Sequence, residues 1–183
     1  MHSLSVIMRA INGLNRLIGG IFSWLSVAIV VVCFWVVIER YFFGNTRLWM
    51  QDLYPWLSGV MFTAVAGYAL LNNDHVRVDI FYRPTSNRNK AWMDLIGVLV
   101  FLLPFTYVVA IYCYTFVARS WGLREGSANP GGAEGLFLVK GFILVFAATL
   151  ALQGISMLIR SILILRGRED LVPHDYRYET LMG

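Results

Sequence analysis

The chain has 183 residues, enough for one domain, and 58% of them are hydrophobic while only 14% are charged. Soluble domains usually carry about 25% charged residues, and the mean hydropathy of this chain is +0.63. The composition therefore excludes an ordinary soluble domain and predicts an integral membrane protein. Its net charge of +4 does not indicate nucleic-acid binding, because the charges follow the expected membrane sides. Cys33 and Cys113 lie in apolar runs and form no CxxC pair or metal motif.

Residues 1–16 repeat apolar side chains at spacings of three and four, and Ser5, Arg9, Asn12 and Arg16 fall on the opposite side. This periodicity is typical of an amphipathic helix. We expect a helix that lies in the membrane interface ahead of the first span. A frayed terminal segment is the alternative.

Four apolar runs follow, each close to or longer than the roughly 20 residues that cross the hydrocarbon core as a helix. They predict an all-α transmembrane domain over residues 17–159, followed by a polar tail at 160–183. The expected spans are about 17–38, 53–71, 91–118 and 136–159.

Prolines and small residues predict local features of the helices. Pro55 is expected in the first turn of the second span, where its missing N–H costs nothing, and Pro104 is expected to kink the third. Gly59, Thr63 and Gly67 recur every four residues of the second span. Such a stripe allows another helix to approach closely.

The polar connection between the second and third spans contains His75, Arg77 and Asp79. A metal site needs three or four suitable ligands, and here one histidine and one carboxylate lie beside a cationic arginine. No nucleophile or phosphate-binding motif is found elsewhere, so we expect no enzyme. We interpret the cluster as a hydrogen-bonded joint, with a solvated loop as the alternative.

Four spans place both termini and the connection around His75 on one side of the membrane. Ten of the 15 Lys and Arg residues lie on that side. The positive-inside rule therefore predicts that the N- and C-termini are cytoplasmic. The connections at 39–52 and 119–135 are expected on the outer side.

The charged residues of the spans, including Arg40, Asp52, Asp94 and Lys140, lie near span ends. A carrier that works alone usually has an ionisable residue deep in a span, and the central halves of these spans have none. The pattern predicts a membrane-embedded partner of another protein. Arg40 and Asp52 are expected either to form an ion pair or, with Trp49, to anchor the chain at the membrane surface.

Several of these motifs resemble one family. His75–Asp79, Asn129–Gly132 and Gln153–Gly154 are similar to segments of the small membrane subunit, the DctQ type, of tripartite ATP-independent periplasmic (TRAP) transporters. The resemblance covers about residues 14–166. One departure is Gln51–Asp52, where the family commonly has two acids, so Asp52 must act alone.

The resemblance implies a non-catalytic scaffold subunit, embedded in the lipid of a bacterial inner membrane, that supports a large elevator-type membrane subunit. It also implies help in docking a periplasmic substrate-binding protein for sodium-coupled uptake of an organic acid or compatible solute. Sodium would bind the large subunit, so no cofactor or metal is expected on this chain. The alternative is a free-standing four-span homo-oligomeric exporter or membrane sensor. Candidate subunit contacts are Arg40, Asp52, His75, Arg77, Asp79 and Lys140, and candidate docking residues are Arg47, Trp49, Arg124 and Glu125.

Overall fold

The computed structural model describes residues 2–45, 47–73 and 85–178, and every regular element within these ranges is helical. The α-helices are α1 (His2–Ser23), α2 (Leu25–Phe42), α3 (Leu48–Leu71), α5 (Asn87–Gly97), α6 (Leu103–Leu123) and α7 (Leu136–Leu165). The π-helical turn η1 (Val98–Leu102) joins α5 to α6, and the 3₁₀ turns η2 (Glu169–Leu171) and η3 (His174–Tyr176) follow α7. His75, Arg77 and Asp79 lie outside the described residues.

Within the described residues, four helical stretches are long and apolar enough to cross a membrane, namely His2–Phe42, Leu48–Leu71, Asn87–Leu123 and Leu136–Leu165. This confirms the prediction of an all-helical chain with four candidate spans. Each stretch is longer than its predicted span, because helical hydrogen bonding continues into the polar flanking residues.

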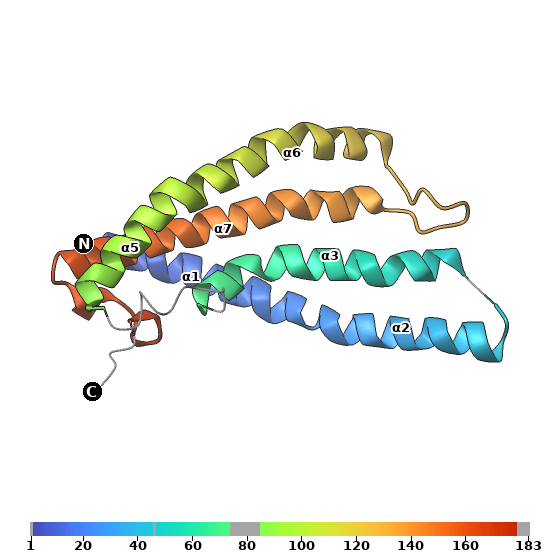
Figure 1. Cartoon of the computed structure of the whole chain (residues 1–183), viewed down its shortest axis with the longest axis horizontal. Coiled ribbons are helices and arrows are strands. Elements are labelled where there is room, and N and C mark those ends of the chain that lie inside the picture. The colour runs from blue at the N-terminus through green and yellow to red at the C-terminus, as the bar shows by residue number, and fades with distance from the viewer. Residues whose placement is uncertain (1, 46, 74–84, 179–183) are drawn as a thin grey trace.

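The long helices form an open layer (Figure 1). The ribbons of α6, α7, α3 and α2 lie side by side in that order, with α2 and α6 at the two edges. α1 packs against both α3 and α7, and α5 packs against α7. No residue of α2, all of which is described, is buried. The layer therefore leaves broad apolar surfaces on its edges and faces.

Each end of the layer has its own connections (Figure 1). The loop end carries residues 43–47, between α2 and α3, and the loop 124–135, between α6 and α7. The terminal end carries the start of α1 and the turns η2 and η3, which share a hydrophobic cluster. An apolar groove of about 730 Å³ is lined mainly by α3, with further residues from the junction of α1 and α2, from η1, and from α6 and α7.

The N-terminal helix continues beyond the expected boundary at residue 16. α1 runs to Ser23 and meets α2 at Trp24. The expected polar face is divided, since Arg9 and Arg16 are exposed whereas Ser5 and Asn12 are buried against the protein. Ser5 and Asn12 turn inward because they find hydrogen-bond partners there.

The prolines mark two positions in the helices. The expectation for Pro55 is wrong, since α3 begins at Leu48 and places this proline inside the helix, where it removes one backbone hydrogen bond. Pro104 lies at the start of α6, directly after η1, where the Leu103 N–H bonds to the Val98 carbonyl. The third span is therefore interrupted by a π-helical turn just before Pro104, where a kink was expected. Ser86 caps α5 by accepting from the Asn89 N–H.

Gly67 brings three helices together. A Cβ atom there would lie 2.8 Å from Asn15 Oδ1 on α1 and 2.9 Å from Thr149 Cβ on α7. Only glycine fits this crossing without a shift of its neighbours. The predicted small-residue stripe on the second span is confirmed at this position, whereas Gly59 meets only Val139, at an ordinary van der Waals distance.

The expected polar tail from Arg160 onward is wrong in its first residues. α7 continues to Leu165, and Arg160 lies within it with only 1% of its side chain exposed. After Gly167, which has a positive φ of 67°, the chain turns back toward α1 and α5. We call residues 169–178 the tail segment.

Candidate functional site

The loop end is organised around Asp52. The Asn129 side-chain amide donates to Asp52 Oδ1 at 2.9 Å, and the Ala133 backbone N–H donates to Asp52 Oδ2 at 3.0 Å. Within the loop, the Ser127 N–H bonds to the Ala133 carbonyl. A Cβ atom at Gly132 would lie 2.4 Å from Asp52 Oδ2, so this glycine lets the backbone wrap around the carboxylate. One carboxylate on α3 thus fixes the loop between α6 and α7.

The expected ion pair between Arg40 and Asp52 is wrong. Both residues are described, and the polar contacts of Asp52 go to the loop 124–135 instead. Glu39 pairs with Arg47, with Arg47 Nε 3.5 Å from Glu39 Oε1. Arg40 is exposed at the end of α2.

A second carboxylate anchors the other side of the loop. Lys140 on α7 donates to Glu125 Oε2, and the Ser120 hydroxyl donates to the same oxygen at 2.6 Å. Lys140 Nζ also lies 4.3 Å from the centre of the Phe116 ring. These hydrogen bonds, first from Lys140 and then from Ser120, hold the pKa of the Glu125 carboxyl below its ordinary value. Lys140 and Glu125, predicted for different roles, are direct partners.

The remaining docking candidates lie at the surface of the loop end. Arg47 precedes α3, and Trp49 is 43% exposed in its first turn. Arg124 ends α6 in the left-handed conformation, with φ of 47°, and is exposed. Asp52 and Glu125 fix the backbone of the loop end. Arg47 and Arg124 are therefore charged groups on a pre-formed surface.

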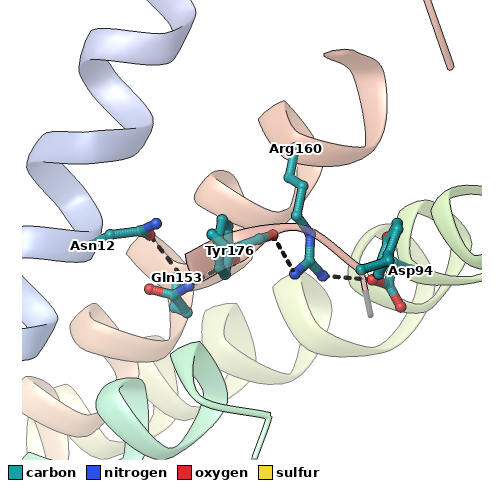
Figure 2. A network of polar contacts seen from close by, with 6 residues as sticks. Asn12, Asp94, Gln153, Arg160 and Tyr176 are labelled. Carbon is teal, nitrogen blue, oxygen red and sulfur yellow. Dashed lines mark hydrogen bonds and ion pairs between the residues drawn. The ribbon is translucent and has the colours of Figure 1, made fainter. Parts of the chain in front are cut away.

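The terminal end contains a polar network that the sequence reasoning missed. Figure 2 shows Asn12, Gln153, Tyr176, Arg160 and Asp94 as a row that runs from α1 past α7 to α5. Gln153 Nε2 donates to Asn12 Oδ1 at 3.4 Å and to the Tyr176 hydroxyl at 2.8 Å. Arg160 Nη2 lies 2.6 Å from Asp94 Oδ2. Burial raises the pKa of the Tyr176 hydroxyl, which therefore stays neutral.

A signal for this network exists in the sequence. Gln153, Ser156 and Arg160 are spaced three and four apart, which places them on one face of α7. Asn12 and Asn15 show the matching spacing on α1. Polar residues that recur at helical spacing in an apolar run indicate a face turned toward the protein. The partner of that face, the tail segment, could not be found from spacing.

The described residues contain no group of three or more His, Cys, Asp or Glu side chains that could hold a metal ion.

Residues 29–163 match the family described as tripartite ATP-independent periplasmic transporters, DctQ component. The chain belongs to this family. The match covers most of the described layer, from early in α2 to near the end of α7. As a DctQ component it is a multi-pass membrane protein and part of a tripartite transporter. No curated protein matches the chain, and no solved structure does.

Within the DctQ match lie Asp52, Glu125 and Lys140 at the loop end and Asp94 and Arg160 at the terminal end. Tyr176 and Tyr178 of the tail segment lie beyond it. Arg160 and Asp94 therefore contact two tyrosines that lie outside the part of the chain covered by the family match.

Proposed function

We propose that this DctQ component is the non-catalytic scaffold subunit of a TRAP transporter in a bacterial inner membrane. It supports a large elevator-type membrane subunit, which carries the sodium and solute sites. Its loop end lies on the periplasmic side and helps dock the substrate-binding protein, and both termini are cytoplasmic. The transported solute is a small organic molecule, either an organic acid or a compatible solute.

The open layer is the observation that supports this proposal most. No side chain of α2, which is fully described, is buried, and only three residues of α6 are. Helices associate in membranes through close packing, so an open layer offers long faces for a larger membrane protein. The charged residues of the layer lie toward its ends. This placement favours a scaffold over a chain that contains its own transport pathway.

The pre-formed loop end supports the docking role. A surface that is already ordered loses less conformational entropy on binding. Arg124 supplies positive charge at the loop 124–135, while the charge of Arg47 is offset by Glu39, so an acidic face on the binding protein would fit beside Arg124.

The proposal is tested by affinity purification of the tagged chain from its native membranes in mild detergent. The scaffold role predicts a complex of stable ratio with one large membrane protein. The alternative, a homo-oligomeric exporter or sensor, predicts particles that contain only copies of this chain. Recovery of such particles alone would contradict the scaffold role.

A further inference from the structure

The tail segment is folded into the layer. Leu171, Val172 and Tyr176 are buried in one cluster with Met8 of α1 and Ala91 of α5. The Ser5 hydroxyl of α1 donates to the Leu171 carbonyl at 2.9 Å. The segment is held because Leu171, Val172 and Tyr176 face the helices, while Glu169, Asp170, His174 and Asp175 stay exposed.

Two tyrosines of the tail segment enclose Arg160. The guanidinium carbon lies 4.3 Å from the centre of the Tyr176 ring and 4.6 Å from that of Tyr178. The Tyr178 hydroxyl donates to Asp94 Oδ2 at 2.7 Å, the same oxygen that receives Arg160 Nη2. Residues of α5, α7 and the tail segment therefore meet at a single ion pair (Figure 2).

Burial of this ion pair depends on the tail segment. A buried ion pair is stable only when other hydrogen bonds satisfy its remaining polar atoms. Tyr178 supplies such a bond to Asp94, and the Tyr176 carbonyl accepts from Arg160 Nη1 at 3.5 Å. The tail and the pair thus stabilise each other.

We propose that the tail segment is a strap that closes over the Asp94–Arg160 ion pair and holds α5 against α7 and α1. The ion pair keeps the strap closed. This role concerns the chain itself and does not rest on the scaffold function.

Cysteine labelling of the full-length chain tests the strap. In a background with Cys33→Ser and Cys113→Ser, a single cysteine is placed at buried Val172 or at exposed His174, two residues along the same segment. The closed strap predicts that V172C reacts with a maleimide at least about tenfold more slowly than H174C in detergent, because labelling then requires local opening.

The contribution of the Asp94–Arg160 ion pair is tested by substitutions that weaken its contacts. Tyr178→Phe and Asp94→Asn should each raise V172C labelling by about three- to tenfold, since each weakens a bond to a charged group. H174C labelling should stay unchanged. If the hydroxyl acts through Asp94, the two changes combined should raise labelling by less than the product of their separate effects. Tyr112→Ala, at an exposed tyrosine of α6, is the matched control and should change neither rate.

Two outcomes would overturn the proposal that the tail segment is a strap held by the ion pair. One is equal labelling of V172C and H174C, which would place the segment in solvent. The other is a V172C rate that neither Tyr178→Phe nor Asp94→Asn alters, which would separate the strap from the ion pair. L171C, at a second buried position, repeats the measurement in case the change at Val172 itself loosens the segment.

Discussion

Asp52 shows how one residue can set the shape of a surface. Its two oxygens hold a side-chain amide and a backbone amide of the same loop, 77 and 81 residues away in the chain. The sequence placed Asp52 correctly near the end of a helical span, yet predicted the wrong partner. Arg40 is near in sequence, whereas the Asn129–Gly132 turn comes near only after α3 and α7 pack together.

Replacement of Asp52 by asparagine should loosen the loop 124–135 while the helices stay intact. The amide side chain nearly keeps the size of the carboxylate but loses the charge that strengthens both hydrogen bonds. We expect faster proteolysis within the loop and an unchanged helix content by circular dichroism. Glu134→Gln, at an exposed acid of the same loop, is the control. Equal proteolysis of the two variants would show that Asp52 does not hold the loop.

The Glu125 contacts predict a pH dependence confined to acid. Since its pKa is lowered in the folded chain, the stabilisation is present above the unfolded-state pKa, near 4.5, and is lost as pH falls through the lower folded-state value. The melting temperature should therefore show no Glu125-dependent change between pH 5 and 8 and should fall below about pH 4.5. Glu125→Gln should remove part of that acid decline. An identical decline in this variant would contradict the assignment.

Arg124 provides the charge test of docking. Charge reversal with Arg124→Glu should weaken the response of uptake to the binding protein, more strongly at low salt than at high salt. Arg9→Glu, at an exposed arginine of the opposite end, is the matched control. Titration of the binding protein across a salt series measures both. A salt-independent or absent effect at Arg124 would count against docking at the loop end.

At the scale of elements, Gly67 is the tightest test of the layer. Gly67→Val would push a side chain into Asn15 of α1 and Thr149 of α7. Such overpacking typically costs about 1–3 kcal/mol, so a lower melting temperature in detergent is expected. Gly20→Val, at a helical glycine with open space around it, is the control for the helix propensity of valine. Equal effects would show that the Gly67 crossing is not tight.

Comparison of the observed helices with the expected ones shows which features could be predicted from the sequence. Long apolar runs predicted four spans, and Pro104 marked the part of the third span where the π-helical turn η1 lies, because these signals are local. The boundaries failed at both termini. α1 buries Asn12 and α7 buries Arg160, and both polar side chains are satisfied by residues distant in sequence. Periodicity locates a polar face but does not reveal what covers it.

At the scale of the whole molecule, the open layer supports the proposal that this DctQ component works together with a larger membrane protein. Its edge helices expose most of their length, and its charges gather at two ends that organise loops. The loop end was partly predictable from the positions of Asp52 and Lys140. At the terminal end the polar spacing on α7 was visible in the sequence, but its partner, the tail segment, was not, because that segment lies outside any periodic pattern.

The central claim is that this chain supports transport without carrying it. The most direct measurement is solute uptake driven by a sodium gradient in proteoliposomes. We predict no uptake with this chain alone, with or without the binding protein, and uptake when the large membrane subunit is reconstituted with both. Uptake by this chain without the large subunit would contradict the scaffold role, as would full uptake when this chain is left out.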